Sequence, residues 1–397
     1  TINPTANSYA YENYILNAGT NKAIRNLNIQ AFVNYERTFN EDHTIKGMIL
    51  YNRESSTTDK NGLASAEVPA KFQGYTGQIN YNYKNRYMFD FNTAYNGTDR
   101  FGQNNRFGFF PAVALGWNIG EEPFFQKRFN DKIDMLKIRT SYGLVGSDIT
   151  PGNRYLYKQV YEPGYGYSFG ETPVGVTSYR EGSLGNEYVT WEKARKFDVG
   201  IDASMFRNKL SFTIDYFYDY RYDQLVERSD VSLLLGIGLP RTNVGETTNH
   251  GFDGQISYND KFGDFNFSTN FVFSYAKNKV KYKAEAQQRY SWLSETGKPI
   301  GQPFGYTWVG YYTPSDISEI NAGNPNKIPV PNIPVSAGDL KYADLNDDGI
   351  IDDFDKGAIG KPNLPTTTLG WTIGGSYKGF SISLLFQGSF DYSFSVV

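Results

Sequence analysis

Residues 74–96 constrain the fold most, because they read as two short strands joined by a tight turn. In each run, aromatic and aliphatic side chains alternate with polar ones. Successive side chains of a β-strand point to opposite faces, so the alternation predicts a hairpin with one apolar and one polar face. Tyrosines lie at both ends of the runs, Tyr83 and Tyr87 beside the turn and Tyr75 and Tyr95 at the far end. Aromatic girdles of this kind flank the membrane-spanning part of outer-membrane strands.

The same alternation recurs along the chain and predicts about a dozen strands. A soluble β-sandwich also alternates, but its outward face is the polar one and its turns are short at both ends. A membrane barrel instead turns its apolar parity to lipid and its polar parity to the lumen. Residues 9–16 give a weaker strand signal. The stronger strands are predicted at 27–37, 43–51, 75–83, 87–95, 109–119, 136–144, 197–205, 210–222, 252–258, 265–275, 371–377 and 380–390.

Parity assigns side chains to the two faces of these strands. Four tyrosines share the parity of Phe212 and Ile214, namely Tyr216, Tyr218, Tyr220 and Tyr222. They could form a sugar-stacking platform, but that parity favours lipid-facing girdle residues. The polar wall of the lumen is predicted to include Gln78, Asn80, Asp90, Asn92, Asp198, Asp202 and Asp215.

The connections differ on the two sides of the predicted sheet. Those on one side are short, apart from 120–135: they are 40–42, 84–86, 207–209, 259–264 and 378–379. Those on the other side are long: 52–72, 145–193, 223–251 and 276–369. Short periplasmic turns and long extracellular loops are typical of outer-membrane barrels. We therefore predict an all-β, antiparallel transmembrane β-barrel, with 276–369 as one extracellular loop of little regular structure.

Composition excludes several other classes of protein. The mean hydropathy is -0.53, and no apolar run approaches the roughly 20 residues of a spanning helix. The net charge of -3 gives no electrostatic reason to expect a nucleic-acid partner. Cysteine is absent, which excludes disulfides and thiolate chemistry. His43 and His250 stand far apart without spaced partners, and no catalytic constellation appears, so we expect no enzyme.

Residues 344–355, DLNDDGIIDDFD, form the one local chemical signature. Positions one, three, five, seven, nine and twelve of an EF-hand-type loop are occupied by Asp344, Asn346, Asp348, Ile350 (through its carbonyl), Asp352 and Asp355. Gly349 stands at position six, where the loop turns sharply. Asp replaces the usual Glu at the last position, and no flanking helices are evident. An Asx-rich surface turn would have a similar composition, but six matching positions favour a Ca²⁺ site.

Several segments resemble SusC/RagA-type TonB-dependent transporters. They are residues 104–125 (NNRFGFFPAVALGWNIGEEPFF), 136–147 (LKIRTSYGLVGS), 183–202 (SLGNEYVTWEKARKFDVGID), 243–253 (NVGETTNHGFD) and 338–388, which contain GDLKYADLNDDGIIDDFD and GSYKGFSISLLFQG. The resemblance implies a barrel of about 22 strands with a plugged lumen. No segment resembles the plug, the TonB-contacting box or the last barrel strands. We therefore expect residues 1–397 to be part of a larger outer-membrane barrel.

The resemblance also implies a function. Such transporters import glycans or peptides, with a SusD-like surface lipoprotein as the lid and TonB acting through the plug. The expected mechanism is ligand capture between the extracellular loops and the lid, followed by passage along a polar lumen. A passive porin or a surface-binding barrel without energy coupling is the alternative. A soluble calcium-binding β adhesin is a third class, which predicts solubility without detergent.

Overall fold

The computed structural model describes residues 24–58, 68–129, 132–151, 154–169, 174–176, 178–231, 238–323 and 328–395. Its main feature is one antiparallel sheet of 12 strands that pair in their order along the chain. The strands are β1 (Ile24–Phe39), β2 (His43–Thr58), β3 (Ala70–Tyr83), β4 (Tyr87–Thr98), β5 (Phe107–Asn118), β6 (Ile133–Ser147), β11 (Glu192–Met205), β12 (Leu210–Val226), β13 (Thr242–Phe262), β14 (Phe265–Tyr282), β21 (Thr367–Tyr377) and β22 (Phe380–Phe390). The weak strand signal at 9–16 lies outside the described residues.

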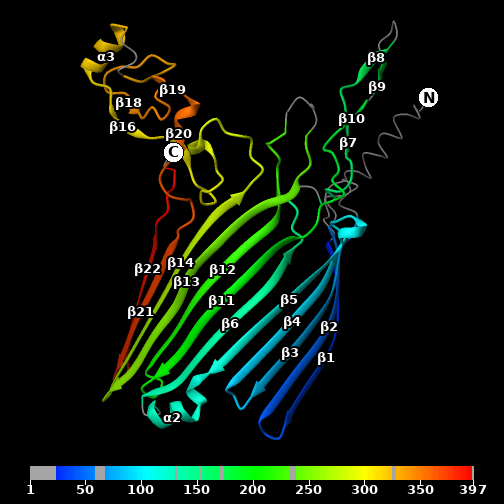
Figure 1. The fold of residues 1–397 in the computed structure, drawn as a ribbon, viewed down its shortest axis with the longest axis vertical. Helices are drawn as coiled ribbons and strands as arrows, with labels where there is room; N and C mark the ends of the chain where they lie inside the picture. Colours follow the sequence, from blue (N-terminus) through cyan, green and yellow to red (C-terminus); the bar gives the residue numbers. More distant parts are fainter. Residues whose placement is uncertain are drawn as a thin grey trace, which may run out of the picture.

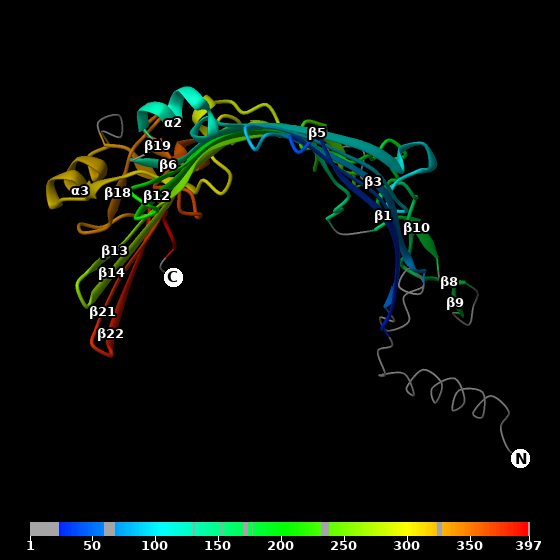
Figure 2. The same cartoon turned by 90° about the horizontal axis from the view of Figure 1, so that it is seen from below.

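The sheet curves into an open arc, with β1 and β22 as its two edge strands (Figures 1 and 2). The predicted all-β antiparallel fold is therefore confirmed. Most strands are longer than predicted; β13, predicted at 252–258, begins ten residues earlier at Thr242. Most of its added residues, including Asn243, Glu246 and Thr247, are polar. Hydrophobic alternation fades there, while the backbone ladder with β12 continues.

Short turns join the strands at one end of the sheet, the lower end in Figure 1. Their residues adopt left-handed backbone conformations, with φ of 54° at Lys84, 55° at Asn85 and 90° at Gly379. Such turns match the right-handed twist of the paired strands. The turn predicted at 259–264 is shorter in the structure. β13 ends at Phe262 and β14 begins at Phe265, so only Gly263 and Asp264 lie between them. The longer connection at this end holds η2 (Ile119–Glu121) and α2 (Pro123–Phe129).

The long connections gather at the opposite end of the sheet (Figure 1). The connection from β6 to β11 contains two small antiparallel pairs, β7 (Tyr161–Pro163) with β10 (Tyr179–Glu181), and β8 (Tyr167–Phe169) with β9 (Val174–Val176). Between β4 and β5 lies η1 (Gln103–Asn105). A buried apolar cluster packs beneath these loops and consists of Phe101, Phe110, Val189, Trp191 and Leu225.

The connection from β14 to β21 leaves and returns at this same end, because β14 and β21 pair directly. The expectation of little regular structure is wrong for its described part. Three small sheets form there: β15 (Phe304–Tyr306) with β20 (Lys356–Ala358), β16 (Trp308–Tyr311) with β18 (Leu340–Tyr342), and β17 (Val330–Pro331) with β19 (Ile350–Ile351). The connection also holds η4 (Ser291–Leu293), α3 (Pro314–Asn321) and η6 (Asp353–Asp355). No helix in the described residues is long and apolar enough to cross a membrane.

Candidate functional site

The register of the sheet brings the predicted polar residues to one face. Gln78 lies opposite Asn92, and Asn80 lies opposite Asp90. Nδ2 of Asn80 donates a hydrogen bond of 2.6 Å to Oδ1 of Asp90. Following the register across β5 and β6 places Asp198, Asp202 and Asp215 on this same face.

The opposite face carries exposed apolar side chains. Ile79 is 49% exposed, Leu115 53% and Ile201 42%, whereas Asp215 on the polar face is only 8% exposed. On a curved sheet, side chains of the concave face crowd together and those of the convex face spread apart. The exposed fractions therefore fit a sheet with its polar face on the inside of the arc. Because the outward face of a membrane barrel is the apolar one, we take the polar face as the wall of the lumen.

The four tyrosines of β12 lie on the lipid side. Tyr216 stands opposite Val199 and Phe252, and its ring centroid lies 5.1 Å from that of Phe252. Toward the long-loop end, Tyr220 and Tyr222 stack at 5.6 Å. They belong to the face of Ile214, as a girdle requires, and not to the lumen wall.

Arg139 is the centre of an ionic network on the lumen wall. From β6 its guanidinium reaches carboxylates on two further strands, β11 and β12. Its Nη2 donates to Oδ2 of Asp215 at 2.7 Å, and its Nε donates to Oδ2 of Asp202 at 3.1 Å. Its Nη1 donates to Oδ1 of Asp198 at 3.3 Å. The planar guanidinium, with five donors, suits such convergent carboxylates, so one residue ties three strands together.

Gly200 makes this network sterically possible. It lies on β11 directly between Arg139 of β6 and Asp215 of β12. A Cβ at this position would lie 2.0 Å from Oδ1 of Asp215 and 2.8 Å from Cζ of Arg139. Only glycine leaves the arginine a path across β11 to the aspartate. Alternation alone would not single out this position, because a glycine has no side chain to classify.

One carboxylate beside the network is left without a cation. Asp253 on β13 stands directly opposite Asp215, and within the described residues it forms no ion pair or side-chain hydrogen bond. By contrast, Asp219 on the same face pairs with Lys196 at 3.4 Å. Like charges placed directly opposite across two strands repel, so the Asp215–Asp253 pair concentrates negative charge on this part of the wall.

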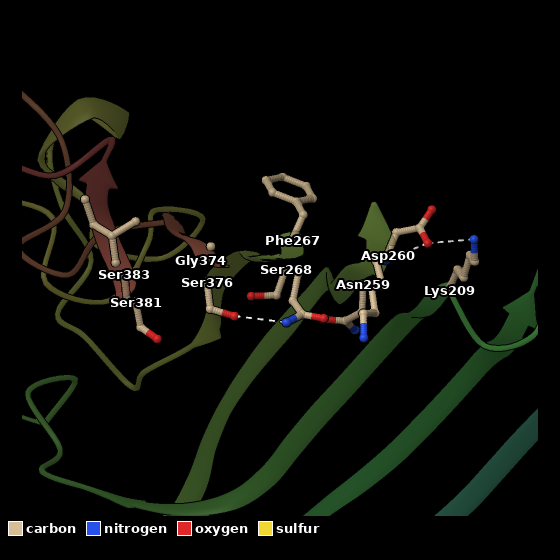
Figure 3. A pocket seen from close by; sticks show the side chains of 13 residues that line it. Lys209, Asn259, Asp260, Phe267, Ser268, Gly374, Ser376, Ser381 and Ser383 are labelled. Atoms are coloured by element: carbon tan, nitrogen blue, oxygen red, sulfur yellow. Dashed lines mark hydrogen bonds and ion pairs between the residues drawn. The ribbon is translucent and has the colours of Figure 1, made fainter. Parts of the chain in front are cut away.

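A groove of about 600 Å³ lies near the short-turn end of β13, β14, β21 and β22 (Figure 3). An ion pair of 2.6 Å between Lys209 and Asp260 lies at its rim. Nδ2 of Asn266 donates to Oγ of Ser376 at 3.1 Å. The remaining lining is rich in small and hydroxyl residues, including Ser268, Gly374, Ser381 and Ser383. Such a surface offers hydrogen bonds to a polar solute and no nucleophile activated by a base.

The predicted calcium loop, residues 344–355, lies in the β14–β21 connection, far from the Arg139 network along the strands. Its side chains turn inward onto the loop's own backbone. Oδ2 of Asp344 accepts from the N–H of Gly349 at 2.8 Å, and Oδ1 of Asp348 accepts from the N–H of Ile350 at 2.9 Å. Oδ1 of Asn346 accepts from the N–H of Asp348 at 3.1 Å. A left-handed φ of 82° at Gly349 makes the sharp bend.

The second half of the loop is closed by its last residues. Asp355 is fully buried, and its two oxygens accept from the N–H groups of Leu345 and Asp352 at 2.8 and 2.9 Å. Oδ1 of Asp352 accepts from the N–H of Phe354 at 2.8 Å. The carbonyl of Phe354 in turn accepts from Nε1 of Trp292 at 2.7 Å, so the loop is tied to residues outside it.

These contacts allow the residues to be tested against a cation. Their order and inward direction fit an oxygen-lined loop, and each carboxylate oxygen retains a second lone pair. The side chains of this loop do not converge on a single point, however. No three His, Asp or Glu side chains in the described parts of the chain are grouped closely enough to hold a metal ion. The structure therefore displays the scaffold of the loop and leaves the Ca²⁺ site a prediction.

Glu285 organises the segment beside this loop. Burial raises the pKa of its carboxyl, but hydrogen bonds from Ser294 and Thr296 outweigh that effect and lower the pKa to about 2. The backbone N–H groups of Glu295 and Thr296 donate to the carboxylate at 3.0 and 2.9 Å. The ionised side chain therefore holds residues 294–296 against the start of the connection.

Comparisons with known proteins agree with this architecture. A family model described as "TonB dependent receptor-like, beta-barrel" matches residues 2–387. TonB-dependent receptor P3 of Formosa agariphila is 28% identical over 402 residues, covering 95% of this chain and 38% of that protein. TonB-dependent receptor SusC of Bacteroides thetaiotaomicron is 27% identical over 332 residues, covering 80% of this chain and 31% of that protein.

Among solved structures, the RagAB peptide importer in its "closed-closed" state matches with a TM-score of 0.69 at 18% identity. That match covers 94% of this chain and 42% of the importer chain. At this identity the likeness bears on the fold alone. The chain spans less than half the length of the relatives it matches.

Proposed function

The chain belongs to the TonB-dependent receptor-like β-barrel family, and we propose that it forms part of the barrel wall of an importer. This importer carries glycans or peptides across the outer membrane. The family consists of outer-membrane transporters and receptors and not of enzymes, so the chain is an outer-membrane protein without catalytic function. The family match over residues 2–387 carries the proposal. The two-faced sheet supports it, because lipid and a polar solute need opposite surfaces.

The proposed mechanism uses the wall in two ways. The exposed apolar face holds the protein in lipid, while the amides, hydroxyls and ionic groups of the polar face line the route of the solute. Capture takes place at the long-loop end, between the loops and a SusD-like surface lipoprotein. Energy comes from TonB through a plug supplied by the rest of the protein. Two matched proteins, TonB-dependent receptor SusC and the RagAB peptide importer, support a role in import by analogy.

Uptake measurements separate an importer from a passive porin. Cells carrying the whole protein are supplied with labelled oligosaccharides or peptides of increasing length, with and without a protonophore. An energised importer loses uptake when the proton gradient collapses, whereas a porin keeps it. Unchanged uptake with the protonophore would replace the proposal by the porin alternative. Co-purification of an affinity-tagged whole protein from the outer membrane tests the lipoprotein partner separately.

We further propose that residues 344–355 bind Ca²⁺ on the extracellular side and thereby order the β14–β21 connection. Asp344, Asn346, Asp348, Asp352 and Asp355 would supply side-chain oxygens, and Ile350 its carbonyl. The order of the six positions and the inward direction of their side chains support this assignment. Extracellular calcium modules function with dissociation constants of about 10⁻⁴–10⁻³ M, so weak affinity suffices there.

Proteolysis of intact cells tests the calcium proposal. Replacing Asp344 and Asp348 by Ala, or adding chelator to the parent, should increase cleavage between residues 338 and 361. Because both side chains also cap backbone N–H groups, the double Asp→Asn variant is the matched control, which keeps an acceptor but removes the charge. If Ala increases cleavage while Asn and chelator do not, the segment is only a hydrogen-bonded turn. Cleavage from the periplasmic side alone would contradict the extracellular placement.

A further inference from the structure

The lipid face of the sheet carries a row of aromatic side chains near its long-loop end. The register places Tyr51, Tyr75, Tyr95 and Phe109 side by side across β2, β3, β4 and β5. The ring centroids of Tyr51 and Tyr75 lie 5.1 Å apart. Aromatic rows of this kind mark the boundary of the apolar band of a membrane barrel. Side chains directly beyond this row therefore meet the lipid headgroups.

The length of β3 agrees with this position. At its short-turn end the ring of Tyr83 stacks on Tyr87 at 6.3 Å, so a second aromatic pair marks the other boundary. Ten residues separate Tyr83 from Gln73, the first outward position beyond Tyr75. With a rise of about 3.3 Å per residue and a tilt of about 40°, they span roughly 25 Å across the membrane. The apolar band of such barrels is about 25 Å tall, so Gln73 lies at the level of the headgroups.

A pocket of about 200 Å³ opens at this level. Three cationic side chains line it: Arg53 of β2, Lys71 of β3, and Arg106, which precedes β5. Side-chain alternation along the paired strands puts Arg53 on the face of Tyr51, and Lys71 on the face of Tyr75. The pocket therefore opens on the lipid side of the sheet and not into the lumen.

The positive charge of this pocket has little compensation. Asp99 is the one carboxylate among the described lining residues, and it is already paired with Arg154 of the β6–β11 connection. Nε of Arg106 donates to a backbone carbonyl at 3.3 Å, which leaves the charge of its guanidinium in place. In the part of the chain that the structure describes, neither Arg53 nor Lys71 forms an ion pair. The pocket therefore suits an anion with several acceptor oxygens.

An aromatic surface adjoins these cations. Phe107 lines the pocket, and its ring stacks on Tyr95 with the centroids 5.1 Å apart. Gly97 stands opposite Phe107, and a Cβ at Gly97 would lie 2.4 Å from a carbon of that ring. Because glycine has no side chain, the ring can lie across β4. The pocket thus places cations directly above an apolar surface, as an amphiphile with an anionic head requires.

We propose that Arg53, Lys71 and Arg106 bind a phosphate group in the headgroup of an outer-leaflet lipid, whose acyl chains lie along the aromatic row. The depth of the pocket matches the level of the headgroups, and a guanidinium matches phosphate oxygens with two parallel hydrogen bonds. Each lysine or arginine near an anionic membrane surface adds to the attraction. The site lies on the outer wall and does not depend on what the lumen carries.

The other half of the sheet repeats the order of aromatic and cationic residues. On β14, Tyr275 stands opposite Phe252 on the lipid face. Lys277 and Lys279 follow at the next two positions of that face, and both are exposed. Cations therefore begin directly beyond the aromatic boundary in two separate parts of the sheet. This recurrence supports a headgroup as the occupant, because lipid surrounds the whole outer wall.

Binding of lipid A, a phosphorylated glycolipid, to the delipidated whole protein tests the site by native mass spectrometry. Arg53→Gln combined with Lys71→Gln should weaken binding roughly thirtyfold, the effect expected of two cations at a lipid surface. The matched control combines Lys46→Gln and Lys84→Gln, which removes the same charge from ion pairs at the short-turn end. This control should bind as the parent does. Exchange of the two cations, Arg53→Lys with Lys71→Arg, should largely retain binding.

The ligand is varied in the same assay. Lipid A without its phosphates should bind the parent at least tenfold more weakly and should not distinguish the parent from the Gln variant. Equal binding of the two forms of lipid A, or equal losses in the Gln variant and its control, would overturn the proposal. If inorganic phosphate at the concentration of the lipid displaces it, the pocket is a site for free phosphate and the assignment to a lipid is wrong.

Discussion

Gly200 is the residue whose identity most directly determines the lumen wall. A Cβ there would lie 2.0 Å from Oδ1 of Asp215 and 2.8 Å from Cζ of Arg139. Gly200→Ala in the whole protein should therefore separate the ion pair and lower stability by about 1–3 kcal/mol, the usual cost of overpacking. Gly47→Ala is the control, since its Cβ would meet nothing nearer than 3.9 Å. The stability of both variants is measured as the temperature at which the heat-modifiable band is lost on gels. If the two variants lost the band at the same temperature, Arg139 could be displaced at no cost.

Glu285 gives a second prediction at this scale, for pH. Its pKa is lowered from 4.5 to about 2 in the folded chain, so the ionised form binds residues 294–296 more strongly. A depressed pKa contributes stability that is present above the unfolded value and is lost as pH falls through the folded one. Protection of the Glu295 and Thr296 amides from hydrogen exchange should therefore decrease between about pH 4.5 and 2. Glu285→Gln should remove that pH dependence; a variant with the parental profile would assign it to another group.

At the scale of the strand, β4 offers two neighbouring residues on opposite faces. Phe91 belongs to the lipid face and Asp90 to the lumen wall. Phe91→Arg should destabilise the membrane-inserted whole protein by roughly 2–4 kcal/mol if it lies near the bilayer midplane. Asp90→Phe, the adjacent control, loses its bond to Asn80 but should leave insertion nearly unchanged. Folding yields into liposomes compare the two, and similar losses for both would contradict the assigned faces.

The strands and their faces could be predicted from sequence because side-chain alternation has a period of two. The Arg139 network could not. Parity places Arg139 and Asp215 on one face. Whether they lie at the same height along the strands depends on the register of β6 against β11, and a connection of more than 40 residues joins these two strands. Short turns specify register, as at Lys84 and Asn85, and long loops do not.

The β14–β21 connection shows a second limit of the sequence. Its prolines and glycines predicted little regular structure, yet three small sheets form there. Their strands are two to four residues long, too short for alternation to be visible. Residues 304–311, which belong to the connection predicted as one loop, pair with β20 and β18 and do not join the main sheet. The connection 378–379 therefore lies at the end of the short turns, as the sequence predicts.

At the scale of the whole molecule, the two open edges of the sheet determine how the chain behaves in lipid. In the 12-stranded sheet, β1 and β22 each pair on one side only, so their outer N–H and C=O groups have no ladder partner. In lipid each such group costs several kcal/mol, and closure of the barrel is what removes edges. Residues 1–397 expressed alone should therefore remain sensitive to protease and show no heat-modifiable band after transfer to liposomes. The whole protein, treated identically, should show both resistance and the band. A protease-resistant barrel formed by residues 1–397 alone would mean that β1 and β22 can meet, and that the arc in Figure 2 is an opened form of a smaller closed barrel.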